Sequence, residues 1–448
     1  MSTDTANAQS TAVDKGHDVL NSLLAGLALP PGSTAQGQPD WLKTLRAQAL
    51  ERANALTLPS THDEAWRFTP LAALAHQSFH VVRTPSELQP DDIAHLSIAE
   101  ATTRLVFVDG VVAPQLSSVS GESGLVIGTL ADLLSGKASG LETHLGQHAN
   151  FQDTLFTAVN TAFLQDAAVL MVPPDTALAA PVHLLFISTQ TEVASHPRLL
   201  LVAGAGSKAT VIEDYVALHD GAYFTNAVAE MVLQPNAQLT HVRLQRESSQ
   251  AFHMASCAVS LGAASHYHSV NLALGAHISR LDLKVVQTAE GTQCTLDGLA
   301  LINGEQLADT HSFIDHAKPH GTSRQLHKCI VGGSAHAVFN GQVMVRPGAQ
   351  QTDSAQSSRN LLLSKKAQID TQPQLEIFAD DVKCTHGATV GQLDSDEVFY
   401  LQSRGLSEHV ARNLLTYAFG AEIIERIPVA SLRQQLEQTV LEQTASQP

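Results

Sequence analysis

Small-residue turns recur between short, β-rich segments over residues 101–390, and this pattern constrains the fold more than any other feature. The segments are rich in Val, Leu, Ile and Thr, without helical patterns between them. Successive turns are 31, 27, 13, 16, 13, 28 and 16 residues apart, mostly near one or two units of about 13 to 16 residues. They lie at Gly204, Pro235, Gly262, Gly275, Gly291, Gly304, Gly332 and Gly348.

Strands that repeat in this way are typical of a solenoid, in which each rung buries its apolar face only by stacking on the next. A β-sandwich is the competing fold, but about 290 residues of strand is long for one sandwich. We therefore predict a mainly β protein with a β-helix core over residues 101–390. Helical patterns predict an N-terminal helical region over residues 1–100 and a C-terminal one over residues 391–448.

The two flanking regions differ in what they suggest. Residues 1–15 are rich in Ser, Thr and Ala, so we expect them to be disordered. In the C-terminal region, Ser407 can cap a helix with an apolar stripe at helical spacing. The stripe either packs on neighbouring helices and caps the solenoid or forms a docking surface for another protein. It includes Val410, Leu414, Leu415, Ala418, Phe419, Ile423 and Ile424.

Composition narrows the classes of function. The formal net charge of −17 repels phosphates, which argues against nucleic-acid binding and against binding to anionic membranes. The chain shows neither a secretory signal nor an uninterrupted membrane-spanning segment, so we expect a cytoplasmic protein. No GxxxxGK[ST] motif occurs, so we expect the chain to bind no nucleotide. The four cysteines form no CxxC pair, which argues against a self-contained zinc or ferredoxin site.

The segment ADDVKCTHGATVG, residues 379–391, carries the most chemically suggestive residues. Cys384 and His386 are two apart, so in an extended strand both side chains face the same side. A thiolate beside an imidazole suits iron, zinc or a persulfide. The alternative is a buried structural cysteine beside a hydrogen-bonded histidine. Other histidines could pair on a metal but are more commonly solvated or packed; they are His266, His268, His311, His316 and His320.

Four segments together carry a resemblance to a known family. They are EAWRFTPL, FNGQVMVRPGAQQTDSAQSSRNLLLS, ADDVKCTHGATVGQLD and VFYLQSRGLS. The chain resembles the SufB/SufD family of iron–sulfur cluster assembly proteins, and DDVKCTHGATVG is similar to its SufD branch. The resemblance implies a right-handed parallel β-helix flanked by helical segments. It also implies a scaffold subunit without catalysis of its own.

The resemblance further implies partners and site residues. SufD pairs with SufB, each contacts a copy of the ATPase SufC, and the complex builds clusters and passes them to apo-proteins. His386 matches the family histidine at the SufB interface, where it would supply a metal ligand or a proton to a transient cluster, and Cys384 matches its neighbour. SufB carries its essential cysteine where this chain has Ser357 and Ser358. The C-terminal helices would dock SufC through Leu414, Leu415, Phe419 and Ile423.

Other functions stay open at this point. Within the family, a SufB-like homodimer would itself hold the cluster. A carbohydrate-active β-helix enzyme would need clustered carboxylates and usually a secretory signal, and neither is evident. A self-associating solenoid would need open rungs at both ends, but helical segments flank this one.

Overall fold

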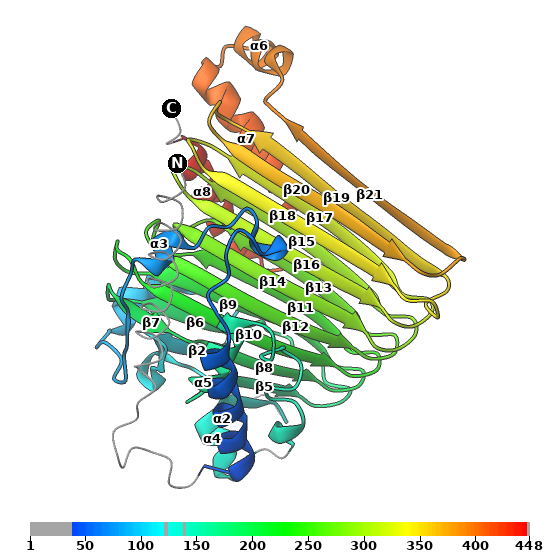
Figure 1. Cartoon of the computed structure of the whole chain (residues 1–448). Coiled ribbons are helices and arrows are strands. Elements are labelled where there is room, and N and C mark those ends of the chain that lie inside the picture. Colours follow the sequence, from blue (N-terminus) through cyan, green and yellow to red (C-terminus); the bar gives the residue numbers. More distant parts are fainter. Residues whose placement is uncertain (1–37, 121–123, 138–139, 446–448) are drawn as a thin grey trace, which may run out of the picture.

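The computed structural model describes residues 38–120, 124–137 and 140–445, and it confirms the mainly β fold with a solenoid core (Figure 1). Two sheets of mostly parallel strands stack face to face, and the chain alternates between them, one strand per sheet in each turn. The expectation that residues 1–15 are disordered lies outside the described residues. Within the described ranges, no helix combines the length and apolar character that a membrane span requires.

We name the two sheets A and B. Along its main path, sheet A contains β4 (Val126–Thr129), β5 (Ala168–Val172), β8 (Arg198–Ala203), β10 (Phe224–Leu233), β12 (Phe252–Leu261), β14 (Ile278–Gln287), β16 (Leu307–His316), β18 (His336–Val345) and β20 (Gln368–Ile377). The short strands β1 (His80–Val81) and β7 (Val193–Ser195) join it at the side. Sheet B contains β3 (Val111–Val112), β2 (Thr103–Val108), β6 (Val182–Ser188), β9 (Lys208–Ala217), β11 (Gln238–Arg246), β13 (His266–Ala273), β15 (Gln293–Ile302), β17 (Thr322–Val331), β19 (Thr352–Leu362) and β21 (Val382–Gly391).

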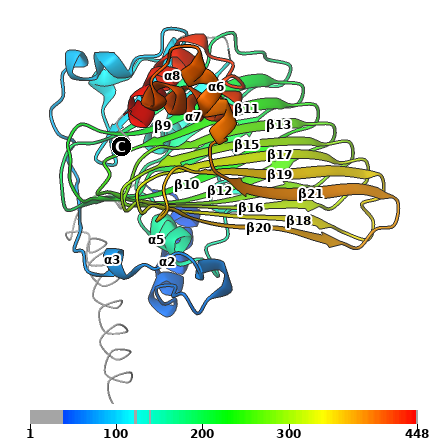
Figure 2. The ribbon, with the colours of Figure 1, turned by 90° about the horizontal axis from the view of Figure 1, so that it is seen from above.

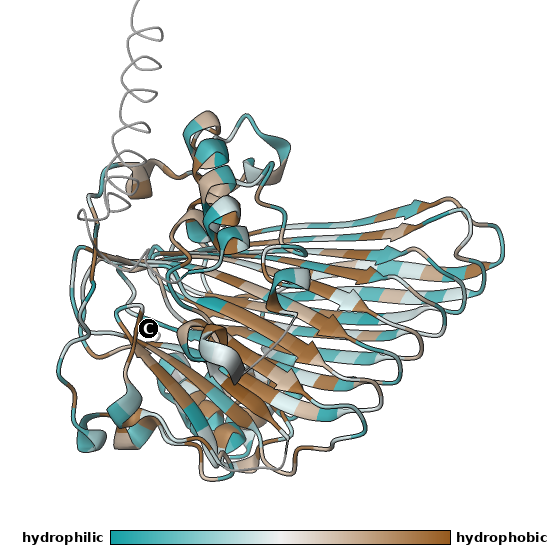
Figure 3. Ribbon diagram, turned by 90° about the horizontal axis from the view of Figure 1, so that it is seen from below, coloured by the Kyte–Doolittle hydropathy of each residue, from teal (hydrophilic) through white to brown (hydrophobic). Residues whose placement is uncertain are grey.

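All eight predicted turns lie between consecutive strands. Glycine is required where stacked turns approach closely: a Cβ on Gly204 would lie 2.7 Å from the backbone oxygen of Val172, and one on Gly262 would lie 2.8 Å from that of Leu233. The main core lies between the sheets, where alternate residues of each strand point inward. Figure 3 shows apolar residues gathered along the strands and polar residues along the turns.

Helices cover the outer face of each sheet. On sheet A, α2 (Asp40–Ala55) packs against α5 (Leu155–Ala162), and Figure 2 shows them on the side opposite the C-terminal helices. Helix α5 and the short α4 (Leu130–Asp132) lie inside the range 101–390, where we expected only strands. All eight residues of α5 are buried. The helix is only eight residues long, which is too short for its apolar spacing to be told from the pattern of a buried strand.

The remaining helical elements, all of which come before β5, are short and pack against the outer face of sheet A or of sheet B. They are η1 (Glu64–Trp66), α3 (Ala72–Ala75), η2 (Pro90–Leu96), η3 (Pro114–Leu116), η4 (Leu133–Lys137) and η5 (Leu141–Thr143). Trp66, Leu74 and Phe79 pack on the outer face of sheet A against Phe224 and Phe252. The N-terminal region therefore covers the solenoid and shares cores with it.

Three C-terminal helices follow the last strand: α6 (Ser395–Ser403), α7 (Glu408–Ile424) and α8 (Ala430–Ala445). Ser407 caps α7 through a side-chain bond to the backbone N–H of Val410, as the sequence predicts. Helices α7 and α8 lie on the outer face of sheet B. There, Lys328 Nζ donates a hydrogen bond of 2.8 Å to the backbone oxygen of Phe419. Their apolar contacts with the sheet come from buried residues, which are Ile423, Ile424, Ile427, Leu432, Leu436 and Val440.

Candidate functional site at the open end of the solenoid

The solenoid ends at β20 and β21, and we call this layer the open end. Each of these strands pairs with a neighbour on one side only, β20 with β18 and β21 with β19 (Figure 1). Their other edges carry backbone N–H and C=O groups without a strand partner, which makes them templates for pairing with another chain. Large apolar side chains are exposed around them: Phe378 is 60% exposed and Val390 is 50% exposed.

Cys384 and His386 lie on the inward face of β21. Val382 and Cys384 pack against the core between the sheets, and residues two apart in a strand share a face. The parallel register places Cys384 beside Ser354 and His386 beside Gln356. The spacing thus correctly predicted one shared face, which turns out to be the interior of the solenoid at its open end.

The two side chains differ in their surroundings. Cys384 is half-buried, and burial raises the pKa of its thiol, with the nearby Asp353 carboxylate acting in the same direction. A hydrogen bond from the Ser354 backbone N–H partly offsets this rise in pKa. The thiol is therefore protonated at neutral pH, and a cation or metal is needed to generate the thiolate. His386 is exposed, and its ring has no hydrogen bond or ion pair within the described part of the chain.

Directly below His386, the interior of sheet B is polar. Gln356 donates from Nε2 to Gln325 Oε1 at 2.8 Å, and Gln325 donates from Nε2 to Ser312 Oγ at 2.7 Å. Gln356 is only 4% exposed. We call these three residues the amide ladder. The amide ladder connects sheet B with Ser312 of sheet A, and its last residue, Gln356, lies one rung below His386.

A second polar chain leads to Cys384. Ser354 lies directly below Cys384 and accepts a hydrogen bond of 2.8 Å at its Oγ from Ser323 Oγ. His316 Nε2 in turn lies 2.9 Å from Ser323 Oγ. Burial lowers the pKa of His316 to about 4, although the Asp315 carboxylate acts to raise it. His316 is therefore neutral at physiological pH, and it closes a chain of uncharged hydrogen-bonding groups beneath the thiol.

The other predicted histidines do not join this site. His266 and His268 lie on the outer face of sheet B, where His268 Nε2 is 2.9 Å from Asp297. His311 pairs with Asp309 at 3.0 Å, while His320 lies in a turn. Among the described residues, no group of three or more His, Cys, Asp or Glu side chains is arranged to hold a metal ion. Cys384 and His386 by themselves are therefore too few side chains to hold a tetrahedral metal ion.

Two family profiles together match most of the chain. The profile of the family described as "SUF system FeS cluster assembly, SufBD core domain" matches residues 186–419, and that of the "SufBD protein N-terminal region" matches residues 32–184. The chain belongs to the SufBD family. It is 40% identical to an iron–sulfur cluster assembly SufBD family protein of Synechocystis, over 92% of this chain and 94% of the relative.

Two SufD proteins are also similar to this SufBD family chain. It is 34% identical to the iron–sulfur cluster assembly protein SufD of Escherichia coli, over 87% of this chain and 90% of the relative. It is 27% identical to SufD of Bacillus subtilis, over 89% of this chain and 93% of the relative. The family therefore acts in iron–sulfur cluster assembly, and the similarity to SufD covers nearly the whole chain.

The two serines in the segment that resembles the cysteine-bearing segment of SufB are both on β19. Ser358 points inward and is buried, where it accepts hydrogen bonds from Thr371 Oγ1 at 3.0 Å and from Asn360 Nδ2 at 2.9 Å. Ser357 points to the outer face of sheet B. The SufBD family core of this chain therefore has hydroxyl groups, and no thiol, at these positions one rung below β21.

The four residues predicted to dock the ATPase have unequal exposure. Leu414 is 45% exposed, Leu415 and Phe419 are half-buried, and Ile423 is completely buried against sheet B. Ile423 is therefore not accessible to a partner in this arrangement. Two exposed side chains of α6 were not predicted to dock the ATPase, although the segment VFYLQSRG contains them: Phe399 at 70% and Tyr400 at 56% exposure. Val410, which belongs to the predicted apolar stripe of α7, is 47% exposed.

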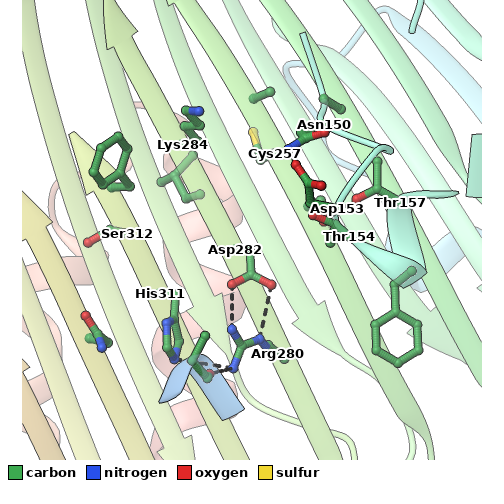
Figure 4. A pocket seen from close by; sticks show the side chains of 18 of the residues that line it. Asn150, Asp153, Thr154, Thr157, Cys257, Arg280, Asp282, Lys284, His311 and Ser312 are labelled. Atoms are coloured by element: carbon green, nitrogen blue, oxygen red, sulfur yellow. Dashed lines mark hydrogen bonds and ion pairs between the residues drawn. The ribbon is translucent and has the colours of Figure 1, made fainter. Parts of the chain in front are cut away.

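A pocket of about 470 Å³ lies elsewhere, on the outer face of sheet A (Figure 4). Its main cation, Arg280, makes two hydrogen bonds to Asp282, at 2.8 and 3.1 Å, and one to Asp309 at 2.5 Å. Arg280 also donates to the backbone oxygen of Ala65 and stacks 3.8 Å over the Trp66 ring. The charges in this pocket hold the N-terminal segment on the solenoid, and the pocket does not include His386.

Proposed function

We propose that this chain is a SufD-type scaffold subunit that assembles iron–sulfur clusters together with a SufB-type subunit and delivers them to apo-proteins. A SufC-type ATPase would hydrolyse the nucleotide, and this chain would act without catalysis of its own. The similarity to proteins named SufD, over nearly the whole chain, supports the SufD type. The transient cluster is the cargo of the complex and would be shared across the interface with the SufB-type partner.

The observation that carries this proposal is the position of Cys384 and His386 on the inward face of the last strand. A protonated thiol and an exposed imidazole are two soft groups, too few for a tetrahedral iron or zinc site. A partner that covers the open end would bring its own thiolate beside them. His386 would then serve as one metal ligand or as a proton carrier, since a neutral imidazole does both.

The free edges of β20 and β21 support the same partner. Another β-helix can pair with such an edge through backbone hydrogen bonds, and alternate side chains then set the specificity. Phe378 and Val390 would be covered by this contact. The ATPase would dock on the exposed side of α6 and α7, through Phe399, Tyr400 and Leu414.

Co-expression tests the assembly. A tag on this chain should recover a SufB-type subunit and a SufC-type ATPase from the same cell, and the purified complex should form a cluster anaerobically with ferrous iron and sulfide. His386→Ala should leave the complex intact and reduce cluster formation. His266→Ala is the matched control, because it changes another exposed histidine on the same sheet but on its outer face.

Two results would contradict the proposal. Recovery of this chain alone, as a monomer, would remove the assembly role. A stable cluster on the isolated chain as a homodimer would favour a SufB-like scaffold in its place.

The proposed docking site of the ATPase is better tested with point variants than with a deletion. Deleting the helices after residue 394 would expose the sheet surface that Ile423 and Leu432 cover, and would destabilise the protein for an unrelated reason. Phe399→Ser combined with Leu414→Ser should abolish recovery of the ATPase and keep the SufB-type subunit. Leu441→Ser, at a 38% exposed site on α8, is the control. Unchanged recovery of the ATPase in the double variant would show that the ATPase does not dock through Phe399 and Leu414.

A further inference from the structure

The amide ladder ends in an unusual group. Gln356 is almost completely buried, yet its Oε1 atom has no hydrogen-bond partner among the described residues. A buried carbonyl oxygen without a partner costs about 1–3 kcal/mol, so such an atom calls for an explanation. The other half of the amide is fixed, because Nε2 donates to Gln325.

The direction of the ladder shows where the oxygen is available. In the structure, Gln325 donates from Nε2 to Ser312 and accepts from Gln356 through Oε1. The amide of Gln356 is therefore held with its nitrogen toward the rung below. The next residue in the same inward row, on the rung above, is His386. Parallel strands are about 4.8 Å apart, so a hydrogen bond between side chains of neighbouring rungs needs only a rotamer adjustment.

A glycine on sheet A leaves room for the Gln356 side chain. Gly341 on β18 lies opposite, and a Cβ at that position would approach Gln356 Nε2 to 2.3 Å. The glycine thus allows the amide to extend across the interior. The ladder runs from Ser312 through Gln325 and Gln356, and it leaves one free acceptor at the open end.

We infer that Gln356 is a positioning residue for His386: its Oε1 accepts one ring N–H and fixes the tautomer and the orientation of the imidazole. The other ring nitrogen then keeps its lone pair for the metal ion or proton handled at the open end. Histidines that bind metals commonly donate their second N–H to a carbonyl or carboxylate in this way. The inference rests on the proposed function for its purpose, but donor and acceptor both belong to this chain, and the His386 ring has to turn inward from its exposed position to form the bond.

The tautomer of His386 tests the hydrogen bond directly. In the full chain labelled with ¹⁵N-histidine, the His386 ring is identified as the signal lost in His386→Ala, and long-range ¹H–¹⁵N spectra report which nitrogen carries the proton. We expect a single tautomer in the natural chain and a mixture in Gln356→Leu. Identical ring spectra in the two proteins would overturn the inference, whatever happens to cluster assembly.

Asn360→Leu is the matched control. Asn360 lies on the same strand and the same face, is 3% exposed and also has a buried side-chain oxygen without a partner, but it faces Val390. This variant should leave the His386 spectrum unchanged. An equal change in both variants would show a general loosening of β19 and would also overturn the inference.

A rescue variant separates positioning from packing. Gln356→Glu keeps an oxygen acceptor, and the Gln325 amide can flip to donate to it because the Ser312 hydroxyl can act as a donor as well as an acceptor. In the purified complex, Gln356→Leu should weaken ferrous-iron binding roughly 10–100-fold, while Gln356→Glu should retain it. If His386→Ala leaves cluster formation intact, the proposed function fails, and the tautomer comparison still decides the role of Gln356.

Discussion

The two ends of the solenoid differ in how their interiors are filled. At the first rungs, aromatic rings stack between the sheets. The ring centroids of Phe107 and Phe186 are 5.2 Å apart, and those of Phe186 and Tyr215 are 4.8 Å apart. At the open end, the inward residues of β19 are polar and buried, as Ser354, Gln356, Ser358 and Asn360. The antiparallel strands β3 and β4 continue the sheets beyond the first rungs, whereas β20 and β21 have no strand beyond them.

The difference teaches how a solenoid can end. An apolar rung is stabilised by burial alone, which has no direction, so the chain can cover it with any apolar surface. A polar rung is stabilised only when each donor and acceptor finds a partner. The last polar rung of this chain leaves the side-chain oxygen of Asn360 without a partner among the described residues. The first end is therefore closed by strands of the described chain, and the open end is where we propose that a partner binds.

The largest expected effect tests the apolar end. Phe186→Ala removes a buried ring from the first rungs and should lower the free energy of unfolding by about 3–5 kcal/mol. Leu375→Ala, at the half-buried open end, should cost less than about 2 kcal/mol because less apolar surface is lost. Urea unfolding followed by circular dichroism measures both. Equal losses would remove the contrast between the two ends.

Acid should weaken the polar half of the solenoid. Burial lowers the pKa of His316 and of His327 to about 4, whereas the unfolded chain has histidine pKa values near 6.5. The unfolded state therefore binds more protons below pH 6.5, and stability is lost as the pH falls from about 6.5 toward 4. At pH 5 each histidine should cost about 2 kcal/mol, from 1.5 pH units at 1.36 kcal/mol each.

His327→Phe tests this pH dependence. The His327 ring stacks on Phe339 at 4.5 Å, and phenylalanine keeps the stacking without the titratable group. The loss of unfolding free energy between pH 7.5 and 5 should shrink by about 2 kcal/mol. His266→Gln, an exposed control, should leave this loss unchanged. An unchanged loss in His327→Phe would place the acid sensitivity elsewhere in the chain.

Partner binding should depend on the apolar rim of the open end. Phe378→Asp changes a 60% exposed ring, so the stability of the isolated chain should shift by less than about 0.5 kcal/mol. The affinity for the SufB-type partner should fall at least about tenfold, since the ring no longer contributes apolar burial. Sedimentation or calorimetry of the purified pair measures the affinity. Val119→Asp, at a 52% exposed site away from the open end, should bind normally.

The smallest expected effect is on the stability of the isolated chain when His386 is changed. His386→Ala removes an exposed ring whose one proposed hydrogen bond is to Gln356, so the free energy of unfolding, measured in urea, should fall by no more than about 1 kcal/mol. Cys384→Ser removes a half-buried thiol and should cost somewhat more. A loss above about 2 kcal/mol in His386→Ala would assign this histidine the structural role that the sequence left open.

Much of the fold could be predicted because it depends on local pattern. The glycine and proline turns mark the ends of strands wherever the chain stacks closely on itself, and all eight candidates lie there. Helix α5 was missed because its eight residues are too few to be told from a buried strand by spacing, and Ile423 was grouped with Leu414 because both belong to one apolar stripe. The stripe gives the spacing of apolar residues along a helix, but not which of them contact the sheet.

The sequence by itself determined that the chain stacks short strands into a solenoid and that Cys384 and His386 share one face, because the two-residue period of a strand is local. Only the tertiary structure decided that β21 is the last strand, that this face looks into the interior, and that Gln356 lies directly below His386. These facts depend on the register between strands about 30 residues apart, which is set by how all the rungs fit together and not by any one segment.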